Sequence, residues 1–157
     1  MRRETSIDLA EDASVLAGEI LVFGRSAHGE TMTCGLVHDS WSVKRDNQLI
    51  WADRFHAADA LLIEALEHPA ALKGMRAAAM LVHVGPGAEQ HVALLRDLML
   101  LAPTEVRCAA TVVNGVLVAR WLAADALSLR PSFAAAWMAL RNDAQGLAPR
   151  LPSFWLH

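Results

Sequence analysis

Alternating apolar and polar residues dominate the first third of the chain and predict short strands over residues 3–9, 14–24, 30–37 and 40–55. The segment "WSVKRDNQLIWADRF" also predicts a hairpin: Trp41 and Val43 alternate with polar residues, "RDNQ" forms the turn, and apolar residues follow on the return strand. The first strand would be an open sheet edge, which proteins usually cover. Either a segment outside this chain pairs with it, or the chain begins within a fold.

Helical and strand patterns mix in the remaining two thirds. Helices are expected over residues 58–67 and 88–101, with a strand over 76–84 between them. The dipeptide Asn114-Gly115 predicts a two-residue hairpin turn. A last helix is expected to start at Pro131, a favoured first-turn residue, and to end near Gly146. Strands followed by mixed elements predict one mainly β domain, residues 1–157, with α-helices on its C-terminal side.

Composition narrows the function classes. The 157 residues are 54% hydrophobic and 20% charged with a formal net charge of −3, which argues against disorder and against a nucleic-acid surface. The most apolar stretch, residues 92–103, is too short to span a bilayer. The two cysteines form no CxxC pair and no secretory signal is evident, so we expect reduced thiols and a soluble cytoplasmic protein.

Enzyme signatures are missing from the sequence. There is no GxxxxGK[ST] loop, no GxSxG elbow and no HExxH pair, and "GRSAHGE" lacks the GxGxxG spacing. We therefore predict no catalytic residue and a protein that is not an enzyme.

Metal ligands are available but scattered among seven histidines and two cysteines. Cys34 and His38 are the closest Cys/His pair. In a strand, positions four apart share a face without converging on one ion, so a buried thiol and a surface imidazole are the favoured interpretation. Weak or transient metal contact stays open as the alternative.

Several charged residues sit beside apolar strands. Arg25 and Glu30 suit an ion pair that closes a turn with Gly24 and Gly29, or a surface facing a partner or a polar channel. Glu19 directly precedes the apolar run "ILVF", where a carboxylate costs free energy unless it is hydrated or paired. Arg25 and Arg54 are its candidate partners. For Glu19 and Asp53 alike, the simplest interpretation is solvation at a sheet edge.

Three segments together resemble the UreD (UreH) family of urease accessory proteins. They are "LAGEILVFGRSAHGET", "VKRDNQLIWADRF" and "APRLPSFWLH", in the family's order and rough spacing. The matching positions are Glu19, Gly24, Arg25, Gly29 and Glu30, then Arg45, Asp46, Leu49, Asp53 and Arg54, and finally Pro149, Arg150 and Trp155.

The match also departs from the family pattern. Asp53 stands where the family usually has glutamate, and the tail has extra residues between Arg150 and Trp155. The resemblance begins in the second half of a UreD protein, so this chain corresponds to a C-terminal portion that lacks the N-terminal strands.

The resemblance implies a non-enzymatic scaffold: a β-helical stack of strands plus two helices, which takes part in inserting nickel into apo-urease. It implies binding to UreF, through UreF to the GTPase UreG, and to apo-urease. Ni²⁺ would pass transiently along an acidic tunnel past Glu19 and Asp53, with no tightly bound cofactor. The turn residues would shape the scaffold, and Trp137, Arg150 and Trp155 would contact a partner. The alternatives are a free-standing metal-binding domain that uses Cys34 and His38, or a non-functional UreD remnant.

Overall fold

A computed structural model describes residues 1–24, 32 and 34–152 of the chain. Its elements, in chain order, are the strands and helices β1 (Arg2–Leu9), β2 (Val15–Val22), β3 (Leu36–Arg45), β4 (Gln48–Ala58), α1 (Asp59–Glu67), β5 (Ala77–Val84), α2 (Ala88–Met99), β6 (Arg107–Val113), β7 (Val116–Ala123) and α3 (Ala126–Asp143).

The strands form two sheets. A three-stranded sheet has the order β1-β3-β4, in which β1 runs parallel to β3 and β3 antiparallel to β4. A four-stranded sheet has the order β2-β5-β7-β6 and is antiparallel throughout. Consecutive strands β1 and β2 therefore belong to different sheets, and the chain crosses between the sheets after each of them.

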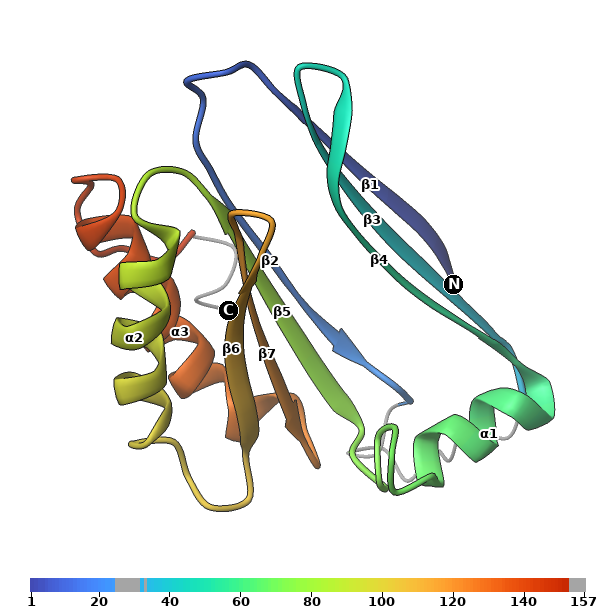
Figure 1. Ribbon diagram of the computed structural model, residues 1–157. Helices are drawn as coiled ribbons and strands as arrows, with labels where there is room; N and C mark the ends of the chain where they lie inside the picture. Colours follow the sequence, from blue (N-terminus) through green and yellow to red (C-terminus); the bar gives the residue numbers. More distant parts are fainter. Residues whose placement is uncertain (25–31, 33, 153–157) are drawn as a thin grey trace.

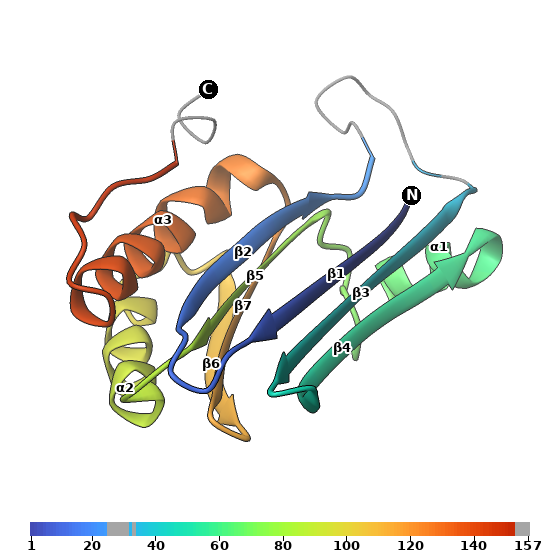
Figure 2. The ribbon, with the colours of Figure 1, turned by 90° about the horizontal axis from the view of Figure 1, so that it is seen from above.

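The molecule has three layers: the helices α2 and α3, the four-stranded sheet and the three-stranded sheet (Figure 1). Viewed from above, α2 and α3 cover one face of the four-stranded sheet and the other sheet lies beyond its opposite face (Figure 2). One core cluster fills the space between helices and sheet, with Trp121 and Phe133 at its centre. A second cluster lies between the sheets, and a smaller third one packs under α1.

The sequence of β5 explains its central place. Its residues are almost all buried, and they alternate between the two clusters: Leu81 faces the helices, whereas Met80 and Val82 face the other sheet. A strand buried on both faces has a nearly continuous apolar sequence, as "AAAMLVHV" does.

Both predicted hairpins are confirmed. Asp46 and Asn47 join β3 to β4 with φ of 48° and 65°, and Asn114 and Gly115 join β6 to β7 with φ of 49° and 74°. Left-handed φ at both central positions is typical of the type I′ turn, whose twist suits a two-residue hairpin. These turns formed where local residue preferences predicted them.

Two predicted boundaries were wrong. The break expected between residues 37 and 40 does not exist, because β3 runs without interruption from Leu36 to Arg45. The last helix starts at Ala126, not at Pro131, because the Asp125 carboxylate accepts a hydrogen bond from the Ser128 backbone N–H at 2.8 Å and caps the helix. Pro131 then lies inside α3.

The mainly β class with a C-terminal helix is confirmed. The described residues contain the three helices that the sequence predicted, whereas the family resemblance implied two; α1 follows β4 directly. The predicted edge strand β1 is indeed an edge of its sheet, paired along one side with β3.

Candidate functional site

A cavity of about 450 Å³ lies between the two sheets. Its walls are mainly apolar, from side chains such as Leu21, Phe23 and Phe55, but charged groups of both signs project into it. The charged lining residues are Glu19, Asp39, Asp53, Arg107 and Arg120. Carboxylates that line a largely apolar, partly open cavity are unusual and point to a function for this cavity.

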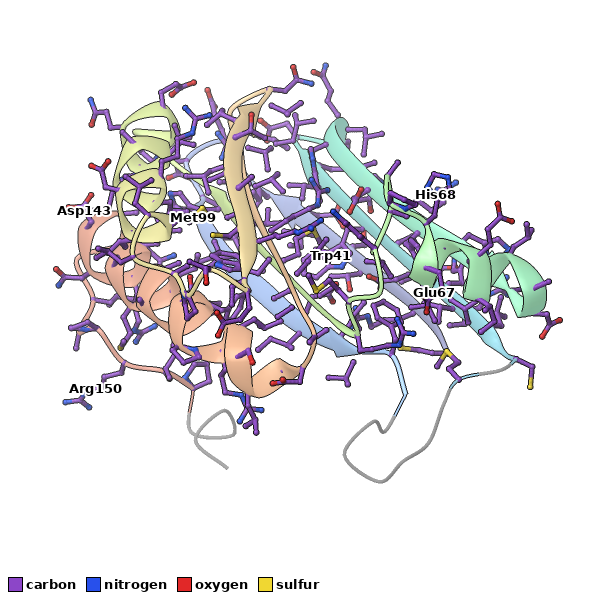
Figure 3. All side chains as sticks on the ribbon, turned by 90° about the horizontal axis from the view of Figure 1, so that it is seen from below. Trp41, Glu67, His68, Met99, Asp143 and Arg150 are labelled. Atoms are coloured by element: carbon purple, nitrogen blue, oxygen red, sulfur yellow. The ribbon has the colours of Figure 1, made fainter. Side chains whose placement is uncertain are left out.

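Glu19 reaches from β2 toward the facing sheet and is held there by two donors. The Arg3 guanidinium pairs with its carboxylate, and the Trp41 indole N–H donates to Glu19 Oε1 at 3.2 Å. The Glu19 side chain is only 10% exposed. Figure 3 shows Trp41 in the space between the two sheets. An acid from one sheet is thus bound by two residues of the other.

Arg3 also binds a second acid. Its Nε donates to Asp39 Oδ1 at 2.9 Å, and Asp39 is buried. Arg3 and Asp39 are register partners in the parallel pair β1–β3, which places them side by side on the inner face. The bond to Asp39 and the nearby Glu19 charge raise the pKa of Arg3 further above its usual value. One guanidinium therefore serves two carboxylates.

The pKa of Glu19 is raised to about 7. Burial is the main cause, because it disfavours the charged carboxylate, and the hydrogen bond and negative charge of Asp39 add to it. Arg3 and Trp41 act in the opposite direction and favour the charged form. Burial therefore favours the protonated form of Glu19, whereas its ion pair with Arg3 favours the carboxylate.

Asp53 enters the cavity from β4, opposite Glu19's sheet. It pairs with Arg120 of β7 at 2.9 Å between Oδ2 and Nη2, and both side chains are partly exposed. Asp53 is the register partner of Trp41, the residue that binds Glu19. The two predicted acids thus line one cavity from facing sheets, each paired with an arginine of the other sheet.

The arginine partners were not found from the sequence. Arg54 was a candidate partner of Glu19, but the structure pairs Glu19 with Arg3 instead, and Arg25 lies outside the described residues. Asp39 did leave a signal: it interrupts the inward-facing apolar series of Val37, Trp41 and Val43. Nothing in the local sequence of Arg3 or Arg120 indicated their roles, because both partners are distant in the chain.

The predicted scaffold turn is described only at its start. Gly24 has a left-handed φ of 89°, a conformation that favours glycine. Arg25, Gly29 and Glu30 lie outside the described residues, so their ion pair stays a prediction.

Cys34 and His38 do not come together as a pair. Cys34 is exposed, so the expectation of a buried thiol was wrong. The residue lies before the start of β3 and is not part of the sheet. His38 lies in β3 beside His56, its register partner in β4. Within the described residues, no group of three or more His, Cys, Asp or Glu side chains is placed to hold a metal ion.

The predicted partner-contact residues lie in and after α3. Trp137 is half-buried and packs against the core between helices and sheet, so part of its side chain has a structural role. Arg150 is exposed beyond the end of α3, as Figure 3 shows. Trp155 lies outside the described residues. Their contact with a partner stays a prediction.

Fold and cavity together define an architecture of two facing β-sheets, backed by helices, with ion-paired carboxylates lining a cavity between them. The family described as "UreD urease accessory protein" matches residues 1–156. The chain belongs to this UreD family.

Relatives of known name support this family assignment. Proteins named "Urease accessory protein UreD" are 43% identical in Magnetococcus marinus, 41% in Azorhizobium caulinodans and 35% in Granulibacter bethesdensis. Each alignment covers 99% of this chain, and 54%, 54% and 63% of the respective relative. The chain spans about half the length of the first two relatives, as a match to only part of a UreD protein predicts.

The helices of the described part of the chain were also compared with the length and hydropathy that a membrane span requires. None is long and apolar enough to cross a bilayer.

Proposed function

We propose that this chain contributes to urease maturation as a scaffold, not an enzyme, and that nickel passes through its inter-sheet cavity on the way to apo-urease. The observation that carries the proposal is the placement of Glu19 and Asp53 in one cavity, on facing sheets. Nickel is the cargo of this route and not a resident cofactor. The names of the relatives, urease accessory proteins, support the same role.

Carboxylate oxygens suit the passage of a divalent cation. They bind Ni²⁺ more weakly than thiolates do, so an ion can arrive and leave again. Glu19, with its pKa of about 7, can take up a cation by releasing a proton and recover the proton when the cation moves on.

In the absence of a metal ion, the two acids of this route are paired with arginines. Arg3 and Arg120 occupy the carboxylates, so an arriving cation competes with a guanidinium for the same oxygens. Arg120 and Asp53 are partly exposed, and a solvated pair of this kind is weak, so it can open at low cost. In this proposal Asp53 is the more accessible acid and Glu19 the more enclosed one.

The partners follow from the family resemblance. UreF would bind this scaffold and recruit the GTPase UreG, and the assembly would dock on apo-urease. Within a full-length UreD protein, the two sheets would be layers of a longer stack of strands. Trp137, the exposed Arg150 and Trp155 are the proposed partner contacts.

The direct test is complementation of urease-positive cells that lack their UreD protein. One strain receives this chain as written, and another receives the chain extended by its in-frame upstream codons; urease activity is read at limiting nickel. In whichever form restores activity, Glu19→Gln and Asp53→Asn should reduce activation. Glu11→Gln is the matched control, because Glu11 is exposed in the turn before β2 and lies outside the cavity lining.

The possible outcomes separate the hypotheses. Activation by both cavity variants at the wild-type level would contradict the nickel route. Failure of both the short and the extended chain to restore activity would favour a non-functional remnant.

A further inference from the structure

Strand β1 has one unpaired edge. It pairs with β3 on one side only, and the three-stranded sheet ends there. In the view from above, no other helix or strand of the described chain is drawn across β1 (Figure 2). An open edge presents backbone N–H and C=O groups that can pair with another strand. The residues of β1 indicate which strand that is.

The backbone of β1 alternates between the paired and the free side. The Met1 carbonyl accepts a hydrogen bond from the His38 N–H at 2.9 Å, and the Leu9 carbonyl accepts one from the Asp46 N–H at 3.1 Å. Successive residues of a strand direct their backbone groups to opposite sides, so the odd-numbered residues of β1 serve β3. The even-numbered residues direct their N–H and C=O groups to the free edge; they are Arg2, Glu4, Ser6 and Asp8.

The same even-numbered residues form the exposed face of β1. Opposite charges lie near the two ends of this row, with Arg2 at the start and Asp8 close to the end. Within the described residues, neither side chain makes a salt bridge. Asp8 has Lys44 as its register partner in β3, so its other neighbouring position, on the free edge, is open to a second cation.

A second copy of β1 complements these charges. In an antiparallel pair centred on Thr5, Arg2 lies opposite Asp8 of the second copy at both ends, and Glu4 lies opposite Ser6. A pair centred on Glu4 would place that acid opposite itself, and one centred on Ser6 would place Glu4 opposite Asp8. Like charges directly opposite each other destabilise a sheet. We propose that β1 is the interface of a homodimer in which two copies pair antiparallel about Thr5.

The inner face of the paired strands adds an apolar contact. Met1 is 54% exposed in the single chain, and in this register it lies opposite Leu9 of the second copy. Each even-numbered pair contributes two backbone hydrogen bonds, or about eight in the whole interface. One strand from each copy makes a smaller interface than that of a permanent dimer, so association is reversible and depends on protein concentration.

The test is sedimentation velocity of the purified 157-residue chain, at protein concentrations from about 5 to about 500 μM. We expect a monomer–dimer equilibrium. Arg2→Glu and Asp8→Arg should each raise its dissociation constant about tenfold, because each places like charges opposite at both ends of the pair. The double variant Arg2→Glu/Asp8→Arg exchanges the charges and should restore the affinity. Asp97→Arg is the matched control, since Asp97 is exposed on α2.

A proline substitution tests the backbone pairing. Ser6→Pro removes an N–H that points to the free edge, and it leaves the backbone hydrogen bonds between β1 and β3 in place. The dissociation constant should therefore rise at least about tenfold, since the change occurs twice in each dimer. A thermal melt checks that the variant folds.

A disulfide reports the register directly. In a Cys34→Ser background, which removes the exposed thiol, Thr5→Cys should give a disulfide-linked dimer on mild oxidation. Facing residues of a non-hydrogen-bonded antiparallel pair lie within reach of a disulfide. Ile7→Cys in the same background is the control, because in this register Ile7 lies opposite Arg3 and not opposite itself.

The outcomes decide between occupants of the edge. A wild-type chain that stays monomeric over the whole concentration range would overturn the homodimer and leave a segment outside this chain as the occupant. A dimer that folded Ser6→Pro does not weaken, or that the charge exchange does not restore, would overturn the pairing through β1. These measurements read association and not urease activity, so they are independent of the proposed nickel route.

Discussion

Arg120 of β7 and Asp53 of β4 join the two sheets across the cavity, with 2.9 Å between Nη2 and Oδ2. On the other side of the cavity, Glu19 and Arg3 make the same kind of link with the charges reversed between the sheets. The sheets are therefore connected by two ion pairs whose acids come from opposite sides, so a cation that displaces either arginine meets a carboxylate already facing the cavity.

The Arg120–Asp53 link should contribute little to stability. Both side chains are 40–49% exposed, and exposed pairs are typically worth less than about 1 kcal/mol. A double-mutant cycle of Arg120→Ala and Asp53→Asn, measured by urea unfolding, should give a coupling free energy below about 1 kcal/mol. A coupling of several kcal/mol would mean that the pair holds the sheets together, and it could not then open for a cation.

The hydrogen bond that Glu19 accepts from Trp41 should contribute more to stability than the exposed ion pair does. Trp41→Phe removes the indole donor to Glu19 but keeps an aromatic ring between the sheets. Because a buried carboxylate then loses a hydrogen bond, we expect a loss of about 1–3 kcal/mol in the free energy of unfolding. Trp51→Phe is the matched control, as Trp51 packs in the same cluster and leaves the donors of Glu19 in place. Equal losses in the two variants would show that ring volume, and not the hydrogen bond, matters.

Stability should depend on pH through Glu19. Its pKa rises from 4.5 in the unfolded chain to about 7 in the folded protein, so between these values the native state binds more protons than the unfolded one. Raising the pH from about 5 to 7.5 should therefore destabilise the protein, by on the order of 1–3 kcal/mol from this group.

Glu19→Gln should remove that dependence, since the amide does not titrate. The measurement is a set of urea unfolding curves for wild type and variant across the pH range. If the two proteins lose stability in parallel as the pH rises, Glu19 is not the group responsible.

The start of α3 gives a prediction on the fold itself. Asp125→Ala removes the cap that accepts from the Ser128 N–H and should cost about 1 kcal/mol. Asp97→Ala, at an exposed position of α2, is the matched control and should cost less. Because hydrogen bonds from Ser128 lower the pKa of Asp125, the capping contribution should be lost as the pH falls into the acidic range. If Asp125→Ala leaves the free energy of unfolding unchanged, the helix starts later in the chain, as the sequence alone predicted.

Part of this structure follows from short-range signals. The hairpin turns at Asp46-Asn47 and Asn114-Gly115, and a strand over 76–84 that the structure places at Ala77–Val84, were predicted because each depends on a few neighbouring residues. The start of α3 also has a local signal in Asp125, although the preference of proline for the first turn predicts a start at Pro131. A good cap outweighed the preference of proline for that position.

The sequence by itself determined the mainly β class, both hairpins and the family, and it predicted a role for the acids Glu19 and Asp53. Only the tertiary structure decided that Arg3 holds Glu19 and Asp39, that Arg120 holds Asp53, and that His38 faces His56. The reason is the range of the interactions. Turns and strands reflect the conformational preferences of adjacent residues, whereas the parallel pairing of β1 with β3 and the facing of the sheets depend on burying apolar surfaces far apart in the chain.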